Sequence, residues 1–484
     1  MRTIPELAEG THRAKATGTL PNGKPVIVNA DGTVSVVGST AVSQAIGSSA
    51  VFESAAAGVG GMGSAFDSSS NKMVIAYRDS GNSNYSTAVV GTVSGTSISF
   101  GTPAVFESSA GQDFSPVFDS NANKVVIAYT GANDYGRSVV ATISGTDITF
   151  GSSVIFYSGV ATFDSAVFDS SNNKIVIAYK DNSNSSIGRA VVGTVSGSSI
   201  SYGSAVTWAS SEIQYPSIAF DSSNNKVVIS SQVGPNGSRN GQSIVGTVSG
   251  TSISFGSLTT FEAGSVDFTS TAFDSINNKI VVAWRIYSGG WYGKAIVGTV
   301  SGTSISFGTV VSYASATITS ISNTFDSNTG TVVVSYRDES NSNKGTFVTG
   351  TVSGTSISFT SPTVFEGDAT NYITSSFDSN SNKVVIAYQD AGNSSYGTAI
   401  VVQPPGSIPN LTAENYIGMS QGGSVADGSS ATVDIIGSLS TNQSGLTAGQ
   451  SYFVQTDGTI GETAADPSVF AGTAISATSL VVKT

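Results

Sequence analysis

Residues 115–150 read SPVFDSNANKVVIAYTGANDYGRSVVATISGTDITF, and this stretch decides the fold. Apolar runs alternate with short polar segments rich in Asp, Asn and Gly, a pattern typical of strands joined by tight turns. The stretch and the six residues after it predict four strands, at 115–120, 124–129, 137–143 and 147–156. The second strand is apolar at the consecutive residues 125–128, so we expect it to be covered on both faces.

The same unit recurs along the chain. Phe-Asp-Ser marks each copy, and its phenylalanines are Phe66, Phe118, Phe168, Phe220, Phe273, Phe325 and Phe377. Successive copies lie 52, 50, 52, 53, 52 and 52 residues apart, a period long enough for four short strands and their turns. Seven copies predict an all-β protein, a seven-bladed β-propeller of four-stranded blades. A β-solenoid is the alternative that the repeat leaves open.

The seventh copy lacks its fourth strand, because the chain turns at Gln403-Pro404-Pro405. The missing strand is found near the amino terminus, where Ala45–Ser54 matches Ser99–Ser108 of the first copy. We therefore expect an N-terminal strand to complete the last blade and close the propeller. Closure removes exposed sheet edges, which otherwise invite aggregation.

Two end segments flank the repeats, and each carries Asp-Gly between apolar runs, at Asp31 and at Asp457. Asp-Gly between such runs is a strong hairpin pattern. The expected domains are an N-terminal arm for attachment with a β-hairpin at 1–40, the propeller at 41–403 and a C-terminal β module at 404–484. We expect the terminal segments to fold together as a small β module.

The composition excludes several kinds of function. The chain has 20 Lys and Arg against 32 Asp and Glu, a net charge of −12 that disfavours nucleic acid as a partner. It has no Cys, which rules out disulfides and thiolate sites, and His12 is its one histidine. No apolar run approaches the roughly 18 residues of a membrane-spanning helix, and no export signal is visible, so we expect no membrane insertion.

Catalytic and metal sites are not predicted. The recurrent Asp lies in a short polar turn without the alternating acidic positions of a calcium loop, so turn stabilisation explains it. The sixth copy has Gly330-Thr331 in place of Asn-Lys, so the recurrent Lys is not expected to be catalytic. No spacing singles out a carboxylate pair for glycoside hydrolysis among Asp113, Asp164, Glu212, Asp267 and Asp368. We expect no enzyme activity, no cofactor and no metal.

The loops divide into two sets. Those between the first and second strands, and between the third and fourth, scarcely vary. Those between the second and third strands, and from one blade to the next, vary widely and share the other face. Variable loops on a rigid scaffold are the usual place for binding, so their face is the candidate ligand-binding surface. Its aromatic and polar candidates are Tyr85, Asp134, Tyr135, Arg137, Tyr215, Arg239, Arg285, Trp291, Tyr292 and Tyr396. The alternative is that these rings only cover blade edges.

At the level of phrases, FDSNSNKVVIAYQDAGNSSYGTAIV (residues 377–401) and GTVSGTSISFGTPAVFES (residues 91–108) resemble repeats in virion proteins of tailed phages of marine bacteria, cyanophage-like proteins described as tail fibre or structural proteins. The end segment from residue 410 to residue 484 resembles a C-terminal module of such proteins. The resemblance covers nearly the whole chain and carries over no catalytic residue.

The resemblance implies a non-enzymatic virion protein, assembled in the host cytoplasm without a signal peptide. We expect a tail-associated fibre or host-recognition component that is oligomeric in the particle. Its partners would be other virion proteins, reached through the terminal arms, and a host surface glycan or protein. Two alternatives stay open: a capsid decoration or scaffold protein, and a carbohydrate-active enzyme or lectin.

Overall fold

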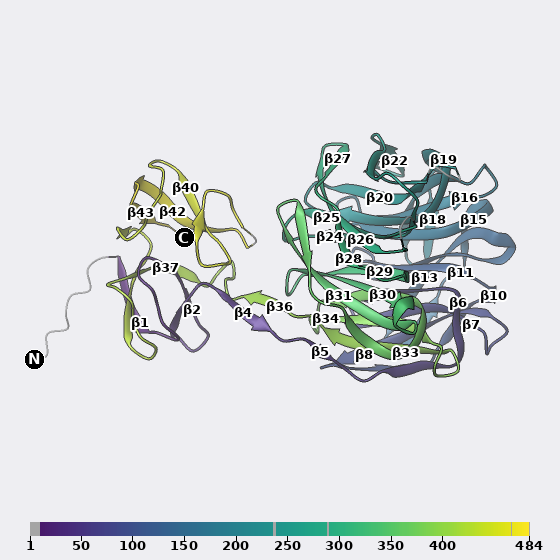
Figure 1. Ribbon diagram of the computed structural model, residues 1–484, viewed down its shortest axis with the longest axis horizontal. Coiled ribbons are helices and arrows are strands. Elements are labelled where there is room, and N and C mark those ends of the chain that lie inside the picture. The colour runs from purple at the N-terminus through teal and green to yellow at the C-terminus, as the bar shows by residue number, and fades with distance from the viewer. Residues whose placement is uncertain (1–9, 236–238, 288–289, 466, 484) are drawn as a thin grey trace, which may run out of the picture. The chain divides into compact units, whose positions relative to one another are not determined.

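The computed structural model describes residues 10–235, 239–287, 290–465 and 467–483, and it confirms the expected all-β class (Figure 1). The regular secondary structure of the described residues consists of antiparallel sheets and two short 3₁₀ segments, η1 (Ala132–Asp134) and η2 (Glu339–Asn341). The chain divides into two compact units, Ser43–Gly406 and the paired end segments Met1–Val42 and Ser407–Thr484. The first nine residues of the predicted arm lie outside the described residues.

Each repeat of the Ser43–Gly406 unit contributes three consecutive antiparallel strands. The first strands are β6 (Ala50–Asp67), β11 (Gln112–Asp119), β15 (Val154–Asp169), β19 (Val206–Asp221), β24 (Val266–Asp274), β29 (Ile318–Asp326) and β33 (Thr363–Asp378). The second strands are β7 (Lys72–Asp79), β12 (Lys124–Thr130), β16 (Lys174–Asp181), β20 (Lys226–Val233), β25 (Lys279–Ile286), β30 (Thr331–Asp338) and β34 (Lys383–Asp390). The third strands are β8 (Tyr85–Ser94), β13 (Tyr135–Ser144), β17 (Ile187–Ser196), β21 (Asn240–Ser249), β26 (Gly293–Ser301), β31 (Lys344–Ser353) and β35 (Tyr396–Gln403).

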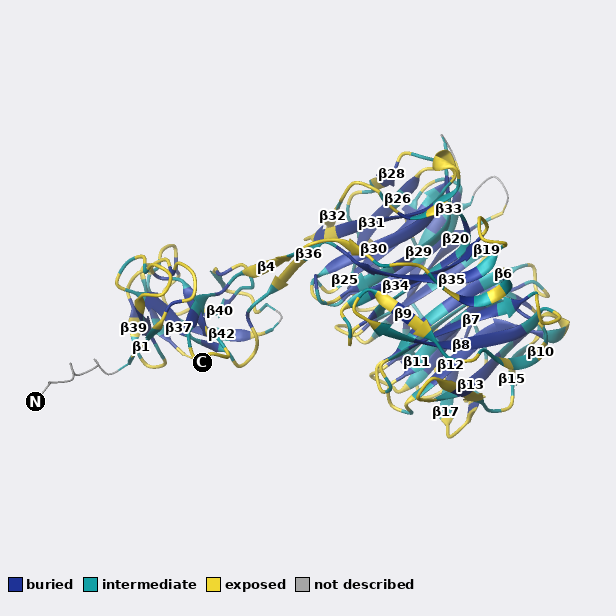
Figure 2. Cartoon of the chain, turned by 90° about the horizontal axis from the view of Figure 1, so that it is seen from below, coloured by how far each residue is buried: buried dark blue, intermediate teal, exposed yellow. Residues whose placement is uncertain are grey.

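The second strands are buried, as their uninterrupted apolar runs predict (Figure 2). Val126 pairs with Val117 of β11 on one side and with Val140 of β13 on the other. Alternate residues of β12 join different apolar clusters: Val125 and Ile127 pack with the preceding repeat, and Val126 with the following one. Each sheet is therefore packed between two others.

The fourth strand predicted at 147–156 is not continuous, and this part of the prediction is wrong. The third strand pairs instead with two separate segments, β14 (Asp147–Phe150) and the start of β15. They part at Gly151, where an added Cβ would lie 1.8 Å from the carbonyl oxygen of Ser198 in the next repeat. The segments equivalent to β14 are β5 (Ala45–Ile46), β9 (Ser97–Phe100), β18 (Ser199–Tyr202), β22 (Ser252–Phe255), β27 (Ser304–Phe307) and β32 (Ser356–Phe359). The segment equivalent to the start of β15 is a strand of its own in three places, β10 (Ala104–Ala110), β23 (Thr259–Glu262) and β28 (Val311–Ala314). Elsewhere it is continuous with the next first strand.

The N-terminal segment of this unit pairs with its last complete strand. Ile46 of β5 pairs with Val402, and Ala50 of β6 pairs with Ala399, so both strands lie against β35. The first strands also neighbour one another in the order β6, β11, β15, β19, β24, β29 and β33, and β33 neighbours β6. Ser115, for example, accepts a hydrogen bond from the Ala166 amide of the next first strand at 2.9 Å.

The recurrent Asp caps the turn after each first strand. Asp169 Oδ1 accepts the amide N–H groups of Ser171 and Asn172, each at 3.0 Å, and the same side chain is buried. Equivalent bonds occur at Asp67, Asp119, Asp221, Asp274, Asp326 and Asp378. The turn therefore uses its carboxylate locally, as an Asx turn does.

The two end segments share one core. Its strands are β1 (Thr11–Lys15), β2 (Pro25–Val28), β3 (Val34–Val36), β4 (Ser39–Val42), β36 (Gly406–Pro409), β37 (Tyr416–Gln421), β38 (Ser430–Asp434), β39 (Leu439–Ser440), β40 (Ser451–Val454), β41 (Ile460–Gly461), β42 (Val469–Ser476) and β43 (Ser479–Val482). Leu20 and Val26 pack with Val433, so neither segment completes the core alone. The predicted hairpins are present, between β2 and β3 at Asp31-Gly32 and between β40 and β41 at Asp457-Gly458.

Candidate functional site

The variable loops lie at one end of the first strands. The amide of Asn182, just after β16, donates to the Val160 carbonyl of β15 at 2.9 Å. The amide of Ala391, after β34, bonds to the Ala369 carbonyl of β33 in the same way. These loops and the adjoining parts of the first strands form what we call the loop face of the Ser43–Gly406 unit.

Every first strand has an irregularity near the loop face. In β11 the pairing with β12 shifts register between Gln112 and Ser115, which leaves an extra residue on the bulged strand. The residue five positions before the Phe of each Phe-Asp-Ser unit has a positive φ, from 50° to 113°. These seven bulge residues are Gly61, Asp113, Phe163, Tyr215, Phe268, Ser320 and Tyr372.

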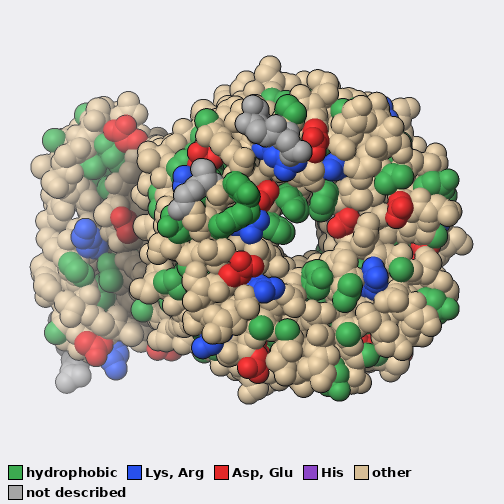
Figure 3. All heavy atoms as spheres, turned by 45° about the vertical axis from the view of Figure 1, so that its right-hand side comes forward, with side chains coloured by type: hydrophobic (Ala, Val, Ile, Leu, Met, Phe, Trp, Pro, Cys, Tyr) green, Lys and Arg blue, Asp and Glu red, His purple; other side chains and the backbone are tan. Residues whose placement is uncertain are grey.

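A cavity of about 330 Å³ lies between the first strands, and all seven strands contribute to its wall. All seven bulge residues line it. Figure 3 shows an opening in this unit with hydrophobic, basic and acidic side chains around it. The volume is at the lower end of the range for small-molecule sites, roughly 300–1,000 Å³.

Three consecutive bulge residues form an arc of aromatic rings in this wall, which we call the aromatic arc. The ring centroids of Phe163 and Tyr215 lie 4.8 Å apart, and those of Tyr215 and Phe268 lie 4.6 Å apart with an angle of 27° between the planes. A left-handed backbone costs a residue with a Cβ roughly 1–2 kcal/mol. Gly61 meets the same backbone demand at the equivalent position, so folding alone does not require large rings there.

Cationic side chains support the arc. Lys180 Nζ lies 5.7 Å from the centre of the Phe163 ring. The Arg285 guanidinium lies 4.7 Å from the Phe268 ring and 4.1 Å from the Trp291 ring, so it is held between them. It also bonds to Asp267 at 2.9 Å, which compensates its charge. Arg285 therefore fixes one end of the arc by stacking.

Asp113 is the one charged residue among the described residues that line the cavity. Its Oδ2 accepts a 2.8 Å hydrogen bond from the backbone N–H of Phe163, the first residue of the arc. Burial raises the pKa of Asp113 to about 6, against the opposing effect of that hydrogen bond. Burial also raises the pKa of the Tyr215 hydroxyl, and the Asp267 carboxylate adds to this effect. The wall thus combines stacking surfaces, hydroxyls and one carboxyl group.

Three of the ten predicted residues gather here. Tyr215 belongs to the arc, Arg285 stacks on it, and Trp291 covers Arg285 from the loop side. Tyr292, next to Trp291, is 38% exposed and does not line the cavity.

The other predicted residues lie away from the cavity. Arg239 is 3.7 Å from Glu212 in an ion pair. Tyr85, Tyr135 and Tyr396 begin the third strands β8, β13 and β35 and are half-buried, and Asp134 is exposed in η1. The structure does not bring these side chains to one site.

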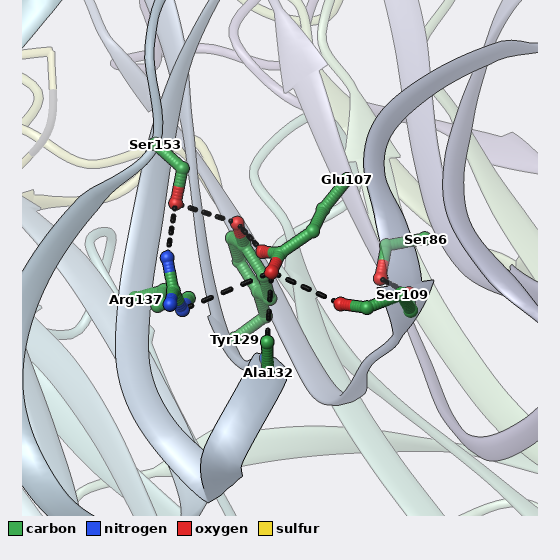
Figure 4. A network of polar contacts seen from close by, with 7 residues as sticks. All are labelled: Ser86, Glu107, Ser109, Tyr129, Ala132, Arg137 and Ser153. Atoms are coloured by element: carbon green, nitrogen blue, oxygen red, sulfur yellow. Dashed lines mark hydrogen bonds and ion pairs between the residues drawn. The ribbon is translucent and has the colours of Figure 1, made fainter.

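Arg137 belongs to a polar network that joins two repeats (Figure 4). Its Nε lies 3.8 Å from Glu107 of β10, and the buried Tyr129 hydroxyl donates to the same carboxylate. Ser153 contacts both partners, at 2.9 Å from the Tyr129 hydroxyl and 3.5 Å from Arg137 Nη1. These contacts give Arg137 a role in packing one repeat against the next.

The sequence did not single out Phe163 or Phe268 as candidate binding residues, and it indicated no second carboxylate to act with Asp113. The pattern that could have found them is the spacing, because aligning the repeats on Phe-Asp-Ser places all seven bulge residues in one column. Within the described ranges, no three acidic or histidine side chains gather as a metal site requires. In the same part of the chain, no helix is long and apolar enough to cross a membrane.

Comparison with known proteins identifies no family. No family model and no curated protein matches the sequence. Among solved structures, the BP39L lectin from Burkholderia pseudomallei is similar, with a TM-score of 0.52 at 10% identity. The match covers 74% of this chain and 100% of that chain. At this identity the likeness is one of fold alone.

Proposed function

We propose that this chain is a non-enzymatic, carbohydrate-binding component of a phage virion, associated with the tail, and that the aromatic arc is its sugar-binding surface. The observation that carries the binding role is the arc itself. Phe163, Tyr215 and Phe268 present large rings to a cavity from a backbone conformation that disfavours them. Strain of this kind clusters at functional sites.

The Ser43–Gly406 unit is, in this proposal, a seven-bladed β-propeller closed by its N-terminal strand. The pairing of β5 and β6 with β35 supports closure, as does the contact between the first strands β6 and β33. The likeness to BP39L supports the same reading, since that chain is matched over its full length. In such a ring the bulge residues of all blades face one central cavity.

Carbohydrate is the ligand class that suits the wall. The apolar faces of a pyranose ring pack on flat aromatic faces, while its hydroxyls require polar partners. The rings of the aromatic arc offer apolar surface, and Ser320 and Asp113 offer polar atoms in the same wall. BP39L is named as a lectin, which agrees with a sugar-binding role for a related fold.

The virion role rests on the resemblance of the repeats and the C-terminal segment to phage tail fibre and structural proteins. A surface dominated by Ser, Thr, Asn and Gly, with 11% charged residues, suits an exposed particle protein. The terminal unit would attach the chain to other virion proteins, and the loop face would meet the host surface glycan. The protein would be oligomeric in the particle.

A glycan array with the full chain tests the binding role. We expect the wild type to bind a defined set of glycans and Tyr215→Ala to lose that binding. Tyr292→Ala is the matched control, because Tyr292 lies on the loop face outside the cavity wall. Unchanged melting temperatures would exclude misfolding. Binding that survives Tyr215→Ala, or a wild type that binds no glycan, contradicts the proposal.

A further inference from the structure

The described cavity wall has one formal charge, and no cation among the described residues pairs with it. Asp113 accepts a single hydrogen bond, from the Phe163 amide to Oδ2 at 2.8 Å, and Oδ1 has no hydrogen-bond partner among the described residues. No described Lys or Arg forms an ion pair with it. A carboxylate that faces a cavity without a counter-ion is costly unless a ligand supplies one.

Some other carboxylates near the loop face have cations of their own. Asp267 bonds to Arg285 at 2.9 Å, and Glu262 bonds to Lys294 at 3.2 Å. Neither Arg78 nor Lys180, two cations whose strands neighbour this part of the wall, forms an ion pair with Asp113. Arg78, from β7, donates to Asn84 at 3.4 Å, and Lys180, from β16, lies over the Phe163 ring. The other titratable groups of the described cavity wall are the hydroxyls of Tyr215, in the arc, and Tyr372. Asp113 thus remains available to a ligand.

Asp113 lies next to the aromatic arc. It bonds to the backbone of Phe163, so the carboxylate adjoins the first ring of the arc. On the other side lies Gly61, with no side chain, and a Cβ there would sit 3.3 Å from the Asp113 amide nitrogen. A side chain at this position would be tight against the backbone of Asp113, and the carboxylate has aromatic surface on its Phe163 side.

We propose that the cavity selects a sugar that carries a free ammonium group, with the pyranose ring on the aromatic arc and the ammonium donating to Asp113. This inference rests on the proposed carbohydrate-binding function and specifies its ligand. An acidic sugar would place two negative charges together, and a neutral sugar would leave Asp113 unpaired. Aromatic faces next to a carboxylate also favour a cation directly.

Calorimetric titration of the full chain at pH 7.5 tests this with two matched pairs of probes. They are D-glucosamine with N-acetyl-D-glucosamine, and D-galactosamine with N-acetyl-D-galactosamine. We expect the wild type to bind at least one free amine about tenfold or more tightly than its acetylated partner. Asp113→Asn keeps the acceptor for the Phe163 amide and should abolish this preference. Asp368→Asn, an exposed carboxylate outside the wall, controls for net charge and should retain it.

The outcomes separate the two proposals. Equal or tighter binding of the acetylated sugars, lost on Tyr215→Ala, overturns the ammonium inference and leaves carbohydrate binding at the arc intact. A preference for the amine that persists in Asp113→Asn also overturns the inference. Absence of binding by all four sugars, together with a negative glycan array, overturns both.

Discussion

The hydroxyl oxygens of Ser64 and Ser376 lie 2.8 Å apart although 312 residues separate them in the chain. They join β6 to β33, the first strands of the first and last repeats. Serine hydroxyls also join first strands within the array, as Ser217 does by accepting the Thr271 amide at 2.8 Å. Hydrogen bonds of serine hydroxyls thus link first strands at the ends of the repeat array as well as in its interior.

Closure can be tested with engineered disulfides, because the chain has no Cys of its own. Ala50 and Ala399 are paired across β6 and β35, and paired antiparallel residues have Cα atoms about 4.5–5.5 Å apart, within disulfide range. We expect Ala50→Cys with Ala399→Cys to oxidise to one internal cross-link that speeds migration on a non-reducing gel. Such a long loop should stabilise the fold by about 6 kcal/mol in the chain-entropy view.

The control pair for closure is Ala50→Cys with Ala88→Cys. Ala88 takes the place of Ala399 in the first repeat but pairs with Ala104. This pair should remain reduced. Cross-linking of both pairs to the same extent, or of neither, contradicts the observed pairing.

A second prediction concerns the glycine between the two segments that follow the third strand in six of the seven repeats; the sixth repeat has Thr360 there. At Gly151, and likewise at Gly101, Gly203, Gly256 and Gly308, an added Cβ would lie 1.8–2.1 Å from a carbonyl oxygen of the next repeat. Gly151→Ala must move backbone and should cost about 1–3 kcal/mol of unfolding free energy. Gly367→Ala is the control, since nothing lies within 4 Å of its Cβ position. Urea titration measures both, and equal stability of the two variants would refute the packing argument.

A third prediction uses the pKa of Asp113. Folding raises the pKa of this carboxyl group to about 6, so its ionisation destabilises the folded state. The resulting loss of unfolding free energy appears as pH rises and reaches its full size above pH 6. Asp113→Asn should therefore stabilise the protein at pH 8 by about 1–3 kcal/mol. The gain should shrink as pH falls through 6 and nearly vanish at pH 4. Asp368→Asn should change stability by less than about 0.5 kcal/mol.

The contrary result would be a loss of stability at pH 8 in Asp113→Asn. Asp113 would then serve the fold through its bond to Phe163. If Asp113→Asn instead gains stability and loses ligand binding, Asp113 is a binding residue that destabilises the fold.

The sequence was sufficient for the elements whose cause is local. The apolar run Val125–Ala128 predicted a strand covered on both faces, because such a strand requires consecutive apolar residues. Asp119 predicted the turn before it, because an Asp side chain can bond to the backbone of the turn that follows it. The fourth strand was predicted wrongly for a non-local reason. Gly151 interrupts it because of the Ser198 carbonyl in the next repeat, which no local pattern reveals.

The candidate site was recovered only in part. The variable connections led to Tyr215, Arg285 and Trp291, but not to Phe163 and Phe268. In the structure Tyr215 lies inside a first strand, at the same bulge position as Phe163 and Phe268. A bulge with a positive φ turns these rings toward the cavity, and alternation along a strand does not anticipate it. The column of bulge residues becomes visible when the repeats are aligned with one another.

The stoichiometry of glycan binding tests the central claim most directly. Isothermal titration of the full chain with the tightest glycan from the array should give one site per chain, because the cavity is shared by all seven first strands. Tyr215→Ala should abolish that site, and Tyr292→Ala should leave its number and affinity unchanged. Several equivalent sites per chain would place binding between repeats and contradict a single aromatic site at the centre. One site whose affinity Tyr215→Ala leaves unchanged would contradict it as well.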